Sequence, residues 1–153
     1  MDTKGRPSTI LLKGDPTFKE LMLNGDVYSA IPITPGMLCE RTATNTVQPH
    51  SSAAGVASPI FAVENAIIGR GKEIPYTVDG EAVLLAFCRP GDSVLALLEA
   101  GAGNVTVIGT LLNSNGAGLL QVGDTNAVAR ALEVVDNDPG VGAAAMWIRV
   151  EAL

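Results

Sequence analysis

The feature that most constrains the fold of this chain is a turn-rich stretch, Pro90–Gly123. It holds short apolar runs, each closed by a turn, at Val94–Leu98, Val105–Ile108, Thr110–Leu112 and Leu119–Val122. Glycine supplies the positive φ angles that such turns need, and Asn and Asp side chains bond their own backbone there. Turns this dense between apolar runs are typical of antiparallel strands in a barrel or sandwich. The stretch therefore predicts the closed centre of a small all-β domain.

Strand patterns continue on both sides of this stretch. Glu81–Cys88 is almost continuously apolar, which predicts a strand that is buried on both faces or lies at an interface. Asp79-Gly80, just before it, is a strong hairpin signal. Ala127–Val135 fits a helical turn or a strand, and its β-branched end favours a strand. Met146–Leu153 predicts a half-exposed strand that alternates Met146, Ile148 and Val150 on one face with Trp147, Arg149 and Glu151 on the other.

Size and charge limit what the domain can do. With 153 residues the chain is the size of one domain, and charged residues make up only 17%, against about 25% in typical globular domains. This low charge predicts that other subunits cover part of the surface. The net charge is −6 and Lys and Arg form no basic stripe, which argues against nucleic-acid binding. No apolar run reaches the roughly 18 residues of a membrane span, so no membrane partner is expected.

Residues 1–24 differ from the rest of the chain. Two short apolar runs, Ile10–Leu12 and Leu21–Leu23, are stopped by Gly14-Asp15-Pro16 and Asn24-Gly25-Asp26. These runs are too short to hold a sheet alone, so we expect an extended N-terminal arm that pairs with the sheet edge of a neighbouring subunit. The alternative is a frayed end followed by one edge strand.

The sequence holds no recognisable catalytic set. His50 is the single histidine and no Gly-x-Ser-x-Gly elbow accompanies it, so we interpret it as a solvated residue at a loop edge. Cys39 and Cys88 are interpreted as buried free thiols, too few and too far apart for a zinc site, and a pair of one of them with the histidine is left open. Asp136 and Asp138 lie in a turn-rich loop without the further oxygen ligands of a calcium site. No enzyme activity, cofactor or metal is expected.

Seven short pieces of turn and strand end follow one another in this chain, at Thr34–Leu38, Val47–His50, Phe61–Asn65, Arg89–Val94, Gly109–Leu112, Asn115-Gly116 and Ile148–Glu151. Their succession resembles the head decoration proteins, or capsid cement proteins, of tailed bacteriophages. The resemblance covers the chain from about residue 25 to residue 153. One departure is Gly109-Thr110, where such proteins often carry Gly-Asp before the following strand.

The resemblance implies a compact β-barrel or jelly-roll-like domain over residues 25–153, preceded by the arm of residues 1–24. It implies a protein of the virion, assembled in the host cytoplasm and bound as a homodimer or homotrimer to the major capsid protein on the outside of the icosahedral head. Beside this pattern, the turn-rich stretch is expected to close the barrel with a core of Leu95, Leu97, Val105, Val107, Leu111 and Leu119.

We expect the capsid contacts on exposed loops and on the apolar side chains of the arm, which are Ile10, Leu11, Leu12, Phe18, Leu21 and Leu23. Binding only the assembled shell would stabilise that shell by the free energy of binding. The alternatives are another virion β-protein, such as a head fibre base or a tail component, and a ligand-binding β-barrel.

Overall fold

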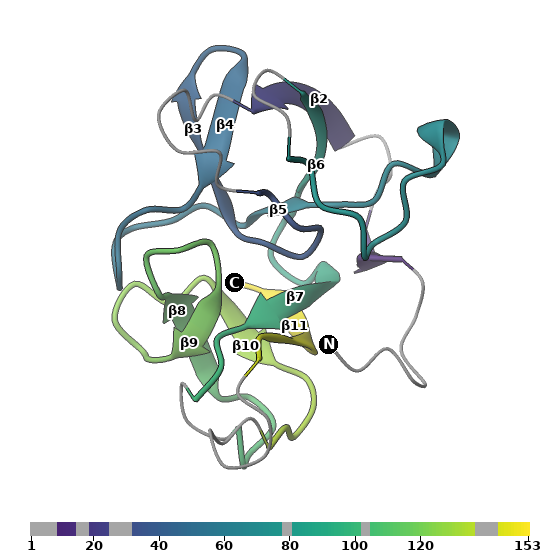
Figure 1. The fold of residues 1–153 in the computed structure, drawn as a ribbon. Coiled ribbons are helices and arrows are strands. Elements are labelled where there is room, and N and C mark those ends of the chain that lie inside the picture. The colour runs from purple at the N-terminus through teal and green to yellow at the C-terminus, as the bar shows by residue number, and fades with distance from the viewer. Residues whose placement is uncertain (1–8, 15–18, 25–31, 78–80, 102–104, 137–143) are drawn as a thin grey trace.

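The computed structural model describes residues 9–14, 19–24, 32–77, 81–101, 105–136 and 144–153 (Figure 1). These residues form two groups of β-strands and one short 3-10 helix, η2 (Ala66–Ile68). The predicted all-β class is confirmed, and so is a closed β-barrel. Among the described residues, no helix has the length and apolar character that crossing a membrane requires.

Five strands close the barrel in the order β7-β11-β10-β8-β9, and β9 returns to pair with β7. The edge of β7 that faces away from β11 is shared, since β1 pairs with it at Val94 and β9 pairs with it at Leu98. Three of these strands come from the turn-rich stretch, as predicted. The bounds are β1 Leu11–Lys13, β7 Ser93–Leu98, β8 Leu111–Ser114, β9 Leu120–Val122, β10 Ala129–Ala131 and β11 Met146–Ala152.

A second sheet lies beside the barrel, with the strand order β3-β4-β2-β6-β5 (Figure 1). All its pairings are antiparallel except β2 with β4. Leu38, just before β3, forms a bridge with Phe61 of β5, so the two outer strands approach each other at that point. The bounds are β2 Lys19–Asn24, β3 Cys39–Ala43, β4 Thr46–Pro49, β5 Ile60–Ala62 and β6 Ala82–Phe87.

The barrel interior corrects two of the predicted core positions. Val107 is 64% exposed, because it stands in a turn where its carbonyl accepts the N–H of Thr110. Leu111 is also exposed, since successive strand residues face opposite sides and Leu112 takes the inward position. The other four are buried in the barrel core or packed against it, as predicted: Leu95, Leu97, Val105 and Leu119.

β11 confirms the strand predicted at Met146–Leu153, but the face that was expected to be exposed is partly buried. The alternation places Trp147 on that face, whereas the structure buries its side chain completely. Its indole N–H donates to the carbonyl of Pro35 at 3.3 Å, and the Nζ of Lys72 lies 4.5 Å from the ring centroid. Segments outside the barrel therefore cover the outer face of β11 at Trp147, whereas Arg149 on the same face stays exposed; a two-residue period along one strand does not reveal this difference.

Two other predicted strands are confirmed, whereas the predicted hairpin turn lies outside the described residues. Glu81–Cys88 contains β6, and Ala127–Val135 contains β10, so the ambiguous segment is a strand of three residues. The hairpin expected at Asp79-Gly80 lies outside the described residues.

The N-terminal residues take places within the sheets of their own chain, which corrects the expected separate arm. β1 pairs with β7, and β2 lies between β4 and β6. The backbone N–H of Ile10 donates to Glu64 Oε2 at 2.9 Å, and the hydroxyl of Thr9 donates to Glu64 Oε1 at 2.6 Å. Because β2 is a central strand of the second sheet, residue 24 does not mark a boundary between an arm and a domain.

Candidate functional site

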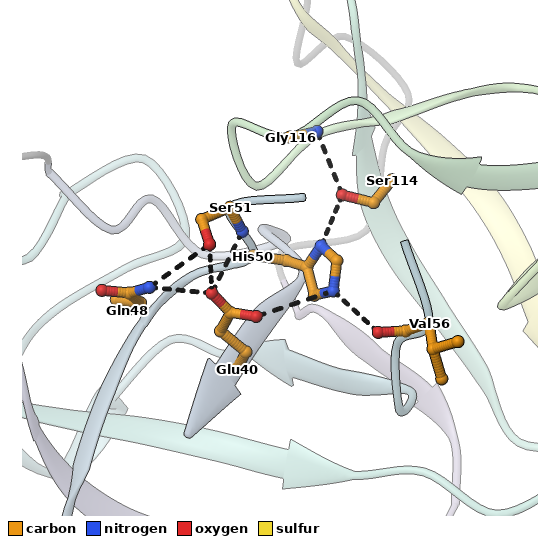
Figure 2. Close-up of polar contacts among 7 residues, drawn as sticks. All are labelled: Glu40, Gln48, His50, Ser51, Val56, Ser114 and Gly116. Atoms are coloured by element: carbon orange, nitrogen blue, oxygen red, sulfur yellow. Dashed lines mark hydrogen bonds and ion pairs between the residues drawn. The ribbon is translucent and has the colours of Figure 1, made fainter. Parts of the chain in front are cut away.

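A network of polar side chains connects the second sheet to the barrel, and its central residue is His50 (Figure 2). His50 directly follows β4, and Ser114 is the last residue of β8. Nδ1 of His50 lies 2.7 Å from Oγ of Ser114, and only 2% of the histidine is exposed. The interpretation of His50 as a solvated loop residue is therefore wrong, because its side chain is buried between the end of β4 in the second sheet and the end of β8 in the barrel.

The hydrogen bonds of His50 define its tautomer. Nε2 lies 3.1 Å from the carbonyl oxygen of Val56, which only accepts, so Nε2 carries the proton. Nδ1 is then the acceptor and receives the hydroxyl proton of Ser114. The oxygen of Ser114 in turn accepts the backbone N–H of Gly116 at 3.1 Å. Both ring nitrogens of a neutral imidazole are thus satisfied.

Glu40 of β3 borders this network with a carboxylate. Oε1 accepts three hydrogen bonds, from Nε2 of Gln48 at 2.7 Å, the N–H of Ser51 at 3.2 Å and the hydroxyl of Ser51 at 2.5 Å. Oε2 lies 3.7 Å from Nε2 of His50. Partial burial acts to raise the pKa of Glu40, but the hydrogen bonds from Ser51 and Gln48 and the nearby His50 outweigh it. The pKa lies below its usual value, so the carboxylate is ionised at neutral pH.

Glu40, His50 and Ser114 are the residue types of a catalytic triad, but their arrangement is that of a buried network. A nucleophilic serine must present its oxygen to a substrate carbonyl. Ser114 is fully buried, and its oxygen is engaged by His50 and by Gly116. In this structure the network orients backbone and loops between the two groups of strands.

A cavity of about 410 Å³ opens beside Glu40, on the side away from Ser114. It lies where β3 and the segment before β5 separate beyond the Leu38–Phe61 bridge. The guanidinium of Arg41 lies 5.0 Å from the ring centroid of Phe87 and 3.6 Å from a carboxylate oxygen of Glu20. The lining residues are Cys39, Glu40, Arg41, His50, Val56, Ala57, Ser58, Pro59, Ile60, Phe87 and Cys88.

Both cysteines line this cavity as free thiols; the predicted burial is confirmed for Cys39, whereas Cys88 is half-buried because it faces the cavity. Burial raises the pKa of Cys39 and the pKa of Cys88 to about 12, so neither is a thiolate at neutral pH. The ring nitrogens of His50 are bonded to Ser114 and Val56, so the histidine does not activate either sulfur. Among the described residues, no three His, Cys, Asp or Glu side chains gather to hold a metal ion.

The residues predicted to contact a capsid have different places in the structure. Ile10 is fully buried, and Leu11 and Leu12 pack against the barrel core, so these three stabilise the domain itself. Leu21 is 56% exposed on β2 and remains available to a partner. Two predicted positions lie outside the described part of the chain, namely Phe18 and the side chain of Leu23.

Two groups of exposed apolar side chains were missed by sequence reasoning. The first, here called the η2 patch, consists of Ile67 and Ile68, and Ile67 is 95% exposed. The second, here called the distal patch, lies where residues 105–109 run beside residues 131–135, joined by the Val105–Val135 bridge and the bond from Gly109 to Ala131. It consists of Val107, Ile108, Leu132 and Val134.

The two patches are far apart. The η2 patch projects from the second sheet, and the distal patch lies at the end of the barrel that points away from this sheet (Figure 1). The sequence signal for both was an apolar pair next to a glycine, Ile67-Ile68 before Gly69 and Val107-Ile108 before Gly109.

Comparison of the sequence with family models and with curated proteins gives no match.

Proposed function

We propose that this protein is a capsid decoration subunit, which binds the outside of a tailed-bacteriophage head and stabilises contacts between major capsid proteins. The observation that supports this proposal is the pair of exposed apolar patches at separate ends of one β-domain. Contiguous apolar side chains on a surface mark sites of protein interaction. The order of turns that resembles decoration proteins supports the same function.

Two separated patches suit a subunit that bridges its neighbours. Fully burying an Ile or Val side chain contributes about 1.5–3 kcal/mol, and Ile67 offers nearly all of its surface for such burial. A subunit held at both ends is bound more tightly than either contact alone allows, because the second contact forms within the complex. Binding to the assembled shell alone then stabilises that shell against its separated subunits.

Co-sedimentation with expanded phage heads tests the proposal. Wild-type protein is expected to bind at a saturable copy number related to the symmetry of the head. Ile67→Asp and Val107→Asp are each expected to weaken binding about tenfold or more, because each places a charge in a desolvated contact. Asn45→Asp, on the exposed turn between β3 and β4, is the control with the same change in charge. Binding of both patch variants at wild-type strength would refute the role of the patches.

The variant Leu21→Asp tests whether the N-terminal residues contribute to binding of the phage head. Deleting residues 1–24 would also remove two strands of the chain's own sheets, so a loss of binding after deletion would be ambiguous. The single substitution alters an exposed side chain of β2 and leaves the backbone pairing in place. Weaker co-sedimentation of Leu21→Asp would support a capsid contact on β2, and unchanged co-sedimentation would exclude it.

We further propose that the subunit acts as a homodimer or homotrimer; a dimer needs one self-complementary surface of each copy, and a cyclic trimer needs two surfaces that fit each other. A mass measurement in solution decides between these states and a monomer. Ligand binding is the second candidate function, and the cavity beside Glu40 favours it, since its volume of about 410 Å³ is within the range of small-molecule sites; this cavity lies at the second sheet and not inside the barrel.

A further inference from the structure

Glu40 lines the cavity, and one of its two carboxylate oxygens, Oε2, can accept further hydrogen bonds. Oε1 of Glu40 accepts three hydrogen bonds, whereas the contact recorded for Oε2 within the described residues is His50 Nε2 at 3.7 Å. That distance is too long for a hydrogen bond, and the proton on Nε2 is already donated to Val56. A carboxylate oxygen has two lone pairs, so Oε2 can accept from a group that enters the cavity.

The wall of the cavity opposite Glu40 is mostly apolar, and Ser58 is its polar residue. Val56, Ala57 and Pro59 lie on the segment before β5, and Ile60 and Phe87 lie on β5 and β6. The carbonyls of Val56 and Pro59 on this wall already receive hydrogen bonds, from His50 and from the backbone N–H of Cys88. A ligand that combines an alkyl chain with a donor at one end matches this wall together with Glu40.

The charges around the cavity favour a cation. Both ring nitrogens of His50 are already engaged, Nδ1 by Ser114 and Nε2 by Val56. The guanidinium of Arg41 is balanced by Glu20, whose carboxylate lies 3.6 Å away on the outer side. Glu40 is the carboxylate of the cavity lining; its Oε2 lies 3.7 Å from His50 Nε2, beyond hydrogen-bond distance, and the hydrogen bonds to Oε1 keep the group ionised at neutral pH.

The geometry also distinguishes between the two kinds of cationic side chain. A guanidinium prefers two carboxylate oxygens, which it binds as a fork. Oε1 of Glu40 is occupied by Ser51 and Gln48, so only one oxygen is available. An ammonium group is a compact point charge that one oxygen can hold.

We propose that this cavity binds an alkylammonium group, the chemistry shared by a lysine side chain and a small primary amine, with the ammonium on Glu40 Oε2 and the alkyl chain along the Val56–Pro59 wall. The proposal goes beyond the capsid role and is tested on the isolated protein. Failure of the capsid experiments therefore leaves it standing, and its own failure leaves the capsid proposal standing.

A titration followed by NMR tests the site directly. n-Butylammonium is added to the full-length, ¹⁵N-labelled protein, and the amide signals of Ala57, Ser58 and Ile60 report occupancy of the cavity. The expected result is saturable shifts of these signals with an affinity in the millimolar range, because the ligand is small. Butan-1-ol, the neutral isostere, is expected to bind at least about tenfold more weakly, since it lacks the charge. Equal binding of amine and alcohol would overturn the proposal.

Two variants and one control locate the site. Glu40→Gln is expected to reduce amine binding at least about tenfold. Ser58→Phe is expected to block the cavity from its exposed side while leaving the hydrogen bonds of Glu40 in place, so it remains informative where Glu40→Gln unfolds the protein. Glu73→Gln removes the same charge from an exposed position outside the cavity lining and should bind the amine normally. Amine binding that survives Ser58→Phe would overturn the assignment to this cavity.

The source of the ammonium group is decided by a second ligand. N-acetyl-lysine N-methylamide carries the same alkylammonium on a peptide backbone. Tighter binding of this compound than of n-butylammonium supports a lysine side chain of a partner protein, and equal or weaker binding supports a free amine. Absence of saturable shifts with both ligands would refute the site.

Discussion

Ser114→Ala removes one oxygen from the buried network that joins the second sheet to the barrel. The hydroxyl donates to Nδ1 of His50 at 2.7 Å and accepts the N–H of Gly116 at 3.1 Å. Because His50 is buried, its Nδ1 loses a partner that water does not replace, which costs about 1–3 kcal/mol. Gly116 is partly exposed and loses less. We expect the free energy of unfolding to fall by about 2–3 kcal/mol in total.

Urea denaturation followed by circular dichroism measures this change. With a slope of about 2 kcal/mol per molar urea for a domain of this size, the midpoint should fall by roughly 1 M. Ser52→Ala makes the same substitution at an exposed position, and its effect should stay within about 0.5 kcal/mol. Adding His50→Phe to Ser114→Ala should cost less than the sum of the two single changes, because both polar partners are then absent. A midpoint of Ser114→Ala that matches Ser52→Ala would refute the network.

Three other predictions concern pH, thiols and one turn. The pKa of Glu40 lies below its ordinary value of 4.5, so its contribution to stability is present above pH 4.5 and is lost as the pH falls through the lowered pKa. Glu40→Gln should therefore be less stable than wild type at pH 7, and the difference in unfolding free energy should shrink as the pH falls below 4.5. Burial raises the pKa of Cys39 and of the half-buried Cys88 to about 12, so both are thiols at pH 8 and iodoacetamide should modify them slowly. Cys39 is fully buried and should react only as the protein unfolds, and rapid labelling of Cys39 in native buffer would contradict its burial. Gly36 has a φ of +97°, and a Cβ there would lie 3.0 Å from a backbone carbonyl oxygen, whereas Gly69, with a φ of +75°, has open space around it. Gly36→Ala should lower the thermal midpoint more than Gly69→Ala. Both substitutions strain the backbone by about 1–2 kcal/mol, and only Gly36→Ala also brings a Cβ too close to a backbone oxygen. Equal midpoints would show that the backbone at Gly36 shifts to relieve this contact.

The fold class was predictable because it depends on local patterns. The turns of Pro90–Gly123 and its apolar runs identify β7, β8 and β9 without knowledge of their partners. The same patterns do not show which strand faces a second layer. Trp147 alternates with inward residues of β11 and is nevertheless buried, because Pro35 and Lys72 cover it from segments far away in the sequence.

The candidate site was not predictable for a related reason. His50 and Ser114 are 64 residues apart, and they meet because the end of β4 lies against the end of β8. Neither residue has a neighbour in the sequence that indicates the other. Glu40 directly follows the apolar residues Met37–Cys39, which was a signal that its charge needs partners, but the identity of those partners depends on strand register.

The shared edge of β7 has a consequence for how the chain folds. β7 pairs with β1 before it and with β9 and β11 after it, and β11 is the last strand of the described chain. Hairpins such as β3–β4 and β8–β9 can form early because their strands are close in the sequence. The barrel closes only when distant segments pair, and such distant contacts favour slow folding. Until β11 arrives, the apolar strand Ser93–Leu98 presents an open edge that can pair with another chain. A chain cut before residue 146 should therefore aggregate during synthesis rather than accumulate as a soluble fragment.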